Sequence, residues 1–161
     1  MSFLDNHVGT DGMYATSGVQ INPHDVFGDD CYALICMGSA FAPSSSTAVQ
    51  TGLYLIDLCT NSVVSSVYLP VSTTTPASFA NDVTVLSGVA YVSDFSGNQV
   101  WAVTVSNLQL SNPRTVLTSA SCAVNDASFC VANPNGMETV SDYVVFSNFN
   151  TGLAKYVPST G

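Results

Sequence analysis

The sequence predicts an all-β protein that is built from repeated units of four antiparallel strands. Two observations support this prediction. Apolar and polar residues alternate in short runs that are bounded by Gly, Asn, Asp, Ser and Pro, which is typical of strands joined by turns. The segment Asn81–Val103, NDVTVLSGVAYVSDFSGNQVWAV, also returns near the C-terminus as PNGMETVSDYVVFSNFNTGLAKYV. No long stretch has a convincing helical period, so we expect very little helix.

A constant spacing sets the register of these two repeats. Asn81 and Asn135 are 54 positions apart (135 − 81 = 54), and the same interval separates Asp94 from Asn148 (148 − 94 = 54). A weaker copy begins near His24, in PHDVFGDDCYALICMGSA. Units of about 40–50 residues with four strands each are the sequence signature of β-propeller blades. We therefore predict a partial propeller of about three blades.

The first predicted blade spans 22–71 and follows a separate N-terminal strand. That strand is expected within 12–21, where the apolar run MYATSGVQI lies. Inside the blade, HDVFGDD is a weak first strand, CYALICM is a buried strand, and GLYLIDL and SVVSSVYLP complete the unit.

The second and third blades are expected at 80–119 and 134–161. Blade two ends with an outer edge strand at Arg114–Leu117, and blade three stops after its third strand. We assign all blades to one domain, 1–161, because a chain of 161 residues is long enough for one sizeable core.

Charge excludes several classes of partner. Charged residues make up 8% of the chain, against about 25% in ordinary globular proteins. Two Lys and Arg residues oppose eleven Asp and Glu residues, so the net charge is −9. Such a surface cannot neutralise phosphates, and we expect no nucleic-acid partner and no attraction to anionic membranes. No apolar run is long enough to span a bilayer. The acidity suits a cation or a neutral sugar-type substrate, or it serves solubility alone.

The five cysteines, Cys31, Cys36, Cys59, Cys122 and Cys130, have no zinc-site spacing. Cys122 and Cys130 could close a small loop, and Cys36 could meet Cys59 across neighbouring strands; buried free thiols are the alternative. These possible pairs, the low Lys content and the Ser/Thr richness favour an extracellular setting. The N-terminus has no features of a signal peptide, so secretion would require a signal that was removed or lies upstream.

The two clear repeats resemble blades of the gluconolactonase/regucalcin-like (senescence-marker-protein) group of six-bladed β-propellers. The related NHL-repeat propellers share the pattern, which is Asn-Asp or Asn-Gly, a hydrophobic strand, a turn, Tyr-Val-x-Asp, a turn and a strand with an aromatic residue. The resemblance covers about residues 22–161. It implies metal-assisted hydrolysis of a lactone or ester of the sugar type. Because such propellers also include binding scaffolds, a non-catalytic module that binds a ligand or a protein is the alternative.

The resemblance also implies a metal site at one mouth of the propeller channel. The Asn of the family's Pro-Asn-Gly motif is a metal ligand and corresponds to Asn135, while an Asn near metal and substrate corresponds to Asn81. Amide oxygens suit Ca²⁺, and Zn²⁺ is the other candidate. The family's Glu ligand and its later Asp ligand have no counterpart in this chain. The alternative is that both Asn residues only form turns.

Four further residues are candidates for substrate binding. His24 and Asp82 lie beside the expected channel mouth, and His24 could act as a general base. Asp94 and Asn148 end second strands, where a substrate contact and a turn-forming role are both open. No catalytic residue is assigned. The sequence also lacks a G-x-S-x-G elbow and a phosphate-binding glycine loop.

Three blades do not close a six-bladed ring, which needs about 250–300 residues at this repeat length. Either the chain is a fragment of a longer protein, or two copies form a homodimer that completes the ring. In the dimer, the strand within 12–21 would supply the missing outer strand of the partner's third blade. An open half-ring would expose apolar faces and favour association.

Overall fold

The computed structural model describes residues 15–21, 31–38, 51–69, 78–118, 133–149 and 152–158. Within these ranges the regular elements are all β-strands, which confirms the all-β prediction. None of the described segments is a helix long and apolar enough to cross a membrane. The strands are β1 (Ala15–Ile21), β2 (Tyr32–Gly38), β3 (Gly52–Asp57), β4 (Ser62–Tyr68), β5 (Ala80–Leu86), β6 (Val89–Asp94), β7 (Gln99–Ser106), β8 (Gln109–Thr118), β9 (Met137–Val140), β10 (Tyr143–Asn148) and β11 (Gly152–Tyr156).

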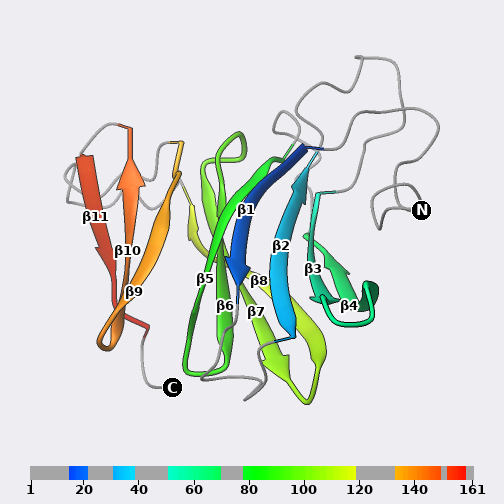
Figure 1. The fold of residues 1–161 in the computed structure, drawn as a ribbon. Helices are drawn as coiled ribbons and strands as arrows, with labels where there is room; N and C mark the ends of the chain where they lie inside the picture. Colours follow the sequence, from blue (N-terminus) through cyan, green and yellow to red (C-terminus); the bar gives the residue numbers. More distant parts are fainter. Residues whose placement is uncertain are drawn as a thin grey trace, which may run out of the picture.

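These strands form three antiparallel sheets in which sequential strands are neighbours (Figure 1). The first sheet has the order β1-β2-β3-β4, the second β5-β6-β7-β8, and the third β9-β10-β11. Tight turns join the strands. In the β5–β6 turn, Ser87 and Gly88 both have positive φ, as expected for the two-residue hairpins that match strand twist. The predicted unit of four antiparallel strands is present twice, and the third unit has three strands.

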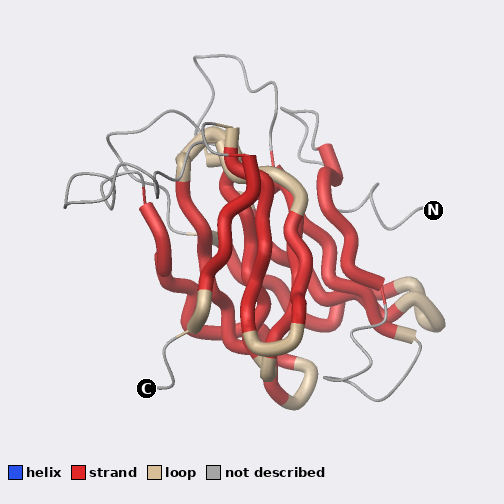
Figure 2. Tube along the Cα trace, turned by 90° about the vertical axis from the view of Figure 1, so that its left-hand side faces the viewer, coloured by secondary structure: helices blue, strands red, loops and turns tan. Residues whose placement is uncertain are grey.

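The three sheets lie side by side as layers, with the second sheet in the middle (Figure 1). The first strands of the sheets are neighbours, because β1 lies against β5 and β5 against β9. The outer strands β4 and β8 also meet. In the view turned by 90°, the antiparallel strands of the sheets lie roughly along the same axis, from one end of the sheets to the other (Figure 2). The starts of β5 and β9 therefore lie at one end of the second and third sheets, and the β5–β6 and β9–β10 turns lie at the other end.

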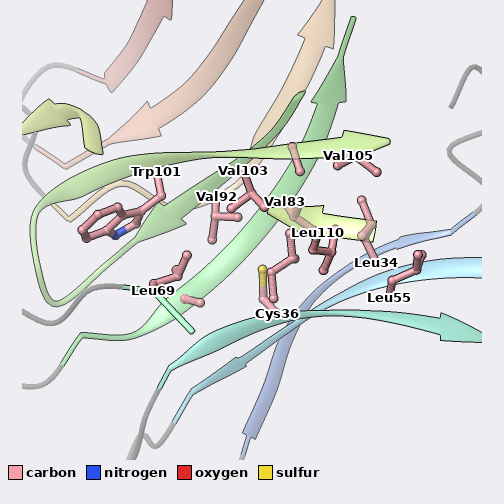
Figure 3. Packing of buried hydrophobic residues seen from close by; sticks show 13 residues of the cluster. Leu34, Cys36, Leu55, Leu69, Val83, Val92, Trp101, Val103, Val105 and Leu110 are labelled. Carbon is pink, nitrogen blue, oxygen red and sulfur yellow. The ribbon is translucent and has the colours of Figure 1, made fainter. Parts of the chain in front are cut away.

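The main apolar cluster fills the space between the first and second sheets (Figure 3). Leu34, Cys36 and Leu55 come from the first sheet, and they face Val92 and Trp101 of the second. These side chains are 0–4% exposed. Because successive side chains of a strand point to opposite faces, the alternate residues of the first sheet contribute nothing to this cluster.

A second cluster joins the second and third sheets. Tyr91, Val100 and Ala102 alternate along β6 and β7 with the residues of the first cluster, and they pack on Val144 and Phe146 of β10. The middle sheet is therefore buried on both faces. This explains why β6 and β7 are nearly continuous apolar runs, whereas a sheet with one wet face alternates.

A buried hydroxyl ties the first sheet to the second. Thr51 donates to the carbonyl of Met37 (3.0 Å) and accepts from the backbone N–H of Ala80 (2.9 Å). A second link comes from Ser65 of β4, whose Oγ accepts from the N–H of Leu110 in β8 (3.0 Å). Backbone groups that the ladders leave unused are thus satisfied between sheets.

The start of the first sheet differs from the sequence prediction. We expected HDVFGDD (24–30) as its first strand and the run at 12–21 as a separate strand that a dimer would exchange. In the structure β1 holds the first position, because Val19 pairs with Ile35 and Ile21 with Ala33 of β2. Ala15 then pairs with Gly38 as Ala80 pairs with Asp94 in the second sheet. Residues 24–30 lie outside the described part of the chain.

The possible pairing of Cys36 with Cys59 is wrong, and the alternative of a buried free thiol is confirmed for Cys36. Cys59 forms a disulfide with Cys31, with the two Cα atoms 5.3 Å apart, and Cys36 is a buried free thiol. The reason is the register of β2 with β3: Cys36 pairs with Leu53 near the start of β3, whereas Tyr32, next to Cys31, pairs with Asp57 at the end of β3, close to Cys59. The N–H of Leu58 donates to the carbonyl of Cys31 (2.6 Å), which holds the two cysteines together. Cys122 and Cys130 lie outside the described residues.

Candidate functional site

The structure brings together the two asparagines that the repeat alignment paired. Nδ2 of Asn81 donates to Oδ1 of Asn135 across the boundary between β5 and β9. Both side chains reach solvent at the end where these strands begin. The backbone of Asn135 is fixed to the third sheet, since its N–H donates to the carbonyl of Ser147 in β10 (3.1 Å). The spacing of 54 residues therefore corresponds to a direct contact in space.

Asp82 lies beside this pair and links the same two strands. Its Oδ2 accepts from the N–H of Met137, the first residue of β9, at 2.7 Å. Its Oδ1 accepts from the N–H of Val83 (2.9 Å), and its own N–H donates to Oγ of Ser93 (3.0 Å). Both carboxylate oxygens thus accept backbone hydrogen bonds. The half-buried side chain fastens β9 to β5.

Two threonines continue the contact further along β5 and β9. The hydroxyls of Thr84 and Thr139 are 2.9 Å apart, and the Thr139 hydroxyl also lies 2.9 Å from the carbonyl oxygen of Val85. We call the set Asn81, Asp82, Thr84, Asn135 and Thr139 the β5–β9 seam. Its polar groups largely hydrogen-bond to one another or to backbone, which is the usual condition of polar groups between packed strands.

The described part of the seam does not fit a metal centre. Ca²⁺ takes six to eight oxygen ligands. Oδ1 of Asn135 accepts a hydrogen bond from Asn81, and both oxygens of Asp82 accept backbone N–H groups. Among the described residues, His, Cys, Asp and Glu gather closely enough for a metal at Cys31, Asp57 and Cys59, and two of these three form the disulfide. His24, the remaining candidate from the sequence, lies outside the described residues.

Asp94 occupies the interior rather than the surface. Its carboxylate accepts from Oγ of Ser78 (2.5 Å), the N–H of Phe79 (2.9 Å), the N–H of Gly97 (2.8 Å) and Nε1 of Trp101 (3.3 Å). The residue is 0% exposed. A Cβ at Gly97 would lie 2.2 Å from Oδ2 of Asp94, so this turn requires glycine. The geometry favours the turn-forming role of Asp94 over a substrate contact.

Asn148 takes the corresponding place in the third sheet. It ends β10 and pairs with Gly152, as Asp94 ends β6 and pairs with Gln99. It is 3% exposed, and its side chain therefore lies inside the protein. The alignment of the repeats correctly identified this equivalence. It could not say that both positions are buried.

Cys36 and Asp57 have shifted pKa values, and neither shift points to catalysis. Burial raises the pKa of the Cys36 thiol well above its usual value, and the negative charge of Asp82 adds to the effect. The thiol stays protonated at neutral pH and is a poor nucleophile. Hydrogen bonds from Thr60 and then Cys59 lower the pKa of the half-buried Asp57, which shapes the β3–β4 turn.

A pocket that the sequence did not predict lies between the second and third sheets, at the end opposite to Asn81 and Asn135. Its volume is about 380 Å³. The lining residues are Leu86, Ser87, Val89, Tyr91, Arg114, Ser141, Asp142 and Pro158. These positions share no motif. The one available signal was Arg114, which is one of only two cations in the chain.

No family model and no curated protein matches the chain. Among solved structures, it is similar to the crystal structure of the computationally designed Ika4 protein. The identity is 10%, the TM-score is 0.40, and the match covers 92% of this chain and 93% of that chain. A likeness of this degree carries no conclusion about the activity of the chain or the arrangement of its sheets.

Proposed function

We propose that the three sheets are blades of a partial β-propeller and that the chain is a non-catalytic scaffold that binds a ligand or a protein. The observation that supports it most is the β5–β9 seam, in which first strands of successive sheets lie side by side. Propeller blades are antiparallel meanders arranged in this way. Within the described residues, the carboxylates of Asp82 and Asp94 accept backbone N–H groups that hold strands and turns in place.

The third sheet offers a surface for a second copy of the chain. Leu153 and Val157 are 76% and 53% exposed, and they alternate with Ala154 and Tyr156, which pack on the second sheet. Phe149, in the turn before β11, is 82% exposed. Exposed apolar groups of this size mark interaction surfaces. We propose that a second copy covers them and completes a six-bladed ring.

Light scattering in solution tests this assembly. We expect a particle of twice the chain mass, and we expect Leu153→Asp to convert it to monomer because an unpaired charge would be buried at the interface. Phe95→Asp is the matched control, since Phe95 is 36% exposed in the β6–β7 turn of the second sheet, away from both ends of the half-ring. A folded wild-type chain that stays monomeric at every concentration would exclude the ring-closing dimer.

A second candidate function is metal-assisted hydrolysis of a sugar-type lactone or ester. The contact of Asn81 with Asn135 favours it, because the resemblance to gluconolactonase-like propellers requires these residues to converge. The described residues supply two amides and no free carboxylate beside them. Further ligands would have to come from elsewhere, so we rank this function below the scaffold.

Calorimetric titration with Ca²⁺ and with Zn²⁺ separates the two functions. The scaffold proposal predicts no saturable heat, because the carboxylate of Asp82 is already hydrogen-bonded to backbone. Saturable binding that Asn135→Ala abolishes, with Gln109→Ala in the exposed start of β8 as the unaffected control, would instead support the hydrolase. Hydrolysis of a sugar lactone that depends on the same metal would support it further.

We further propose that the protein works in an oxidising, extracellular compartment. The Cys31–Cys59 disulfide supports this proposal, because such bonds persist mainly in secreted proteins.

A further inference from the structure

We propose that the pocket between the second and third sheets binds a small zwitterion with an apolar side chain, which is the chemistry of an apolar amino acid. Its volume of about 380 Å³ lies within the range of small-molecule sites, about 300–1,000 Å³. The inference rests on the scaffold function, for which it names a ligand class. It needs only one chain, because every lining residue belongs to the same copy.

The walls of the pocket suit an apolar group. Leu86 and Val89 flank the β5–β6 turn and pack against the cluster that joins the two sheets. Pro158 closes the side that follows β11. Tyr91 adds an aromatic wall, and its ring centroid lies 5.7 Å from that of Tyr156. A hydrophobic side chain placed here would leave water and contact the apolar lining, which favours binding.

Two opposite charges line the same pocket. Arg114 comes from β8 and Asp142 from the β9–β10 turn, and both are exposed. No ion pair links Arg114 to Asp142 or to any other residue that the structure describes, so the guanidinium and the carboxylate are open to a ligand. Ser87 and Ser141 add hydroxyl groups to the lining.

The two charges together select the ligand class. A simple anion would meet Arg114 but would also face Asp142 and a net chain charge of −9. A simple cation would meet Asp142 but would face Arg114. A zwitterion places its carboxylate on the guanidinium, which binds carboxylates with two parallel hydrogen bonds, and its ammonium on Asp142. Burial also raises the pKa of Tyr91, with a smaller contribution from Tyr156 and against the opposing charge of Arg114, so its phenol stays a neutral hydrogen-bonding group.

The ligand class is tested by calorimetric titration of the full chain with four probes. These are L-phenylalanine, 3-phenylpropanoate, 2-phenylethylamine and glycine, and the last three each lack one of the ammonium, the carboxylate and the apolar group. We expect saturable binding of L-phenylalanine and at least about tenfold weaker binding of every other probe. Absence of saturable L-phenylalanine binding, or equal affinity for either singly charged analogue, would overturn the proposal.

The location is tested with variants that change one charge each. Arg114→Gln and Asp142→Asn are expected to weaken L-phenylalanine binding about tenfold or more, and Arg114→Lys is expected to restore part of it. Lys155→Gln and Glu138→Gln make the same charge changes outside the lining and should leave the affinity unchanged. Retained affinity in Arg114→Gln and Asp142→Asn, with a native circular dichroism spectrum, would place the ligand elsewhere. The scaffold function is judged separately, by the calorimetric titration with Ca²⁺ and Zn²⁺.

Discussion

Asp94→Ala is expected to lower the free energy of unfolding by about 3–5 kcal/mol, one of the two largest effects that we predict. The substitution leaves four donors without an acceptor in a site that is 0% exposed. Each unsatisfied buried donor costs about 1–3 kcal/mol, and such costs are not additive within one network. The affected donors are Ser78, Phe79, Gly97 and Trp101.

Urea unfolding followed by tryptophan fluorescence measures this effect directly. Trp101 is the only tryptophan of the chain, and its Nε1 donates to Asp94, so the signal reports on the site itself. Asp94→Asn keeps the shape of the side chain but places an amide N–H₂ among hydrogen-bond donors. We expect it to lower the free energy of unfolding by about 2–3 kcal/mol. Asp142→Asn, in an exposed turn, is the matched control and should stay within about 0.5 kcal/mol.

These variants also decide between the two roles that the sequence left open for Asp94. A turn-forming residue lowers stability when it is replaced. A residue that only contacts substrate would leave stability unchanged. An Asp94→Ala chain within about 1 kcal/mol of the wild type would contradict the structural role. If Asp94→Ala does not fold, Asp94→Asn carries the same comparison.

Loss of the Cys31–Cys59 disulfide is expected to lower stability by about 3–4 kcal/mol. The bond closes a loop between residues with a sequence separation of 28. Such a loop lowers the conformational entropy of the unfolded chain, so its removal stabilises the unfolded state. We expect a reductant to shift the urea midpoint of the wild type. Without reductant, the double variant Cys31→Ala/Cys59→Ala should already have the lower urea midpoint. Its midpoint should not show the shift that reduction of this bond causes in the wild type.

Peptide mapping under non-reducing conditions provides the structural control for this prediction. The map should contain a Cys31–Cys59 cross-link and a free Cys36 thiol. A cross-link between Cys36 and Cys59 would contradict the structure. A wild-type midpoint that does not move with reductant would contradict the energetic estimate.

The β5–β9 seam shows how far repeat spacing can reach. An interval of 54 residues indicated that Asn81 and Asn135 occupy equivalent places, and the structure joins their side chains. The spacing could not show that Asp82 bridges to the N–H of Met137, because this bond depends on how two separate sheets are placed against each other. The spacing identifies equivalent residues in two units, whereas the seam depends on how the two units pack against each other.

The cysteines show a second limit. Cys36 and Cys59 belong to strands and turns that are close together, so their pairing was reasonable from the order of the elements. The register of β2 with β3 decided the matter, because it pairs Cys36 with Leu53 near the start of β3 and leaves Cys31, just before β2, beside Cys59. The sequence predicted the strand CYALICM, but its register with β3, which decides which cysteines meet, came only from the structure.

The sequence by itself determined the all-β class, the antiparallel units and the equivalence of Asn81 with Asn135 and of Asp94 with Asn148. The class and the units follow from local alternation and turn residues within short segments, and the equivalences follow from a fixed spacing between two similar segments. Only the tertiary structure decided that Asp94 is buried and accepts hydrogen bonds from four donors. It also decided that Arg114 and Asp142 line one pocket. Burial and convergence depend on packing between sheets, where the contacting residues are far apart in the chain.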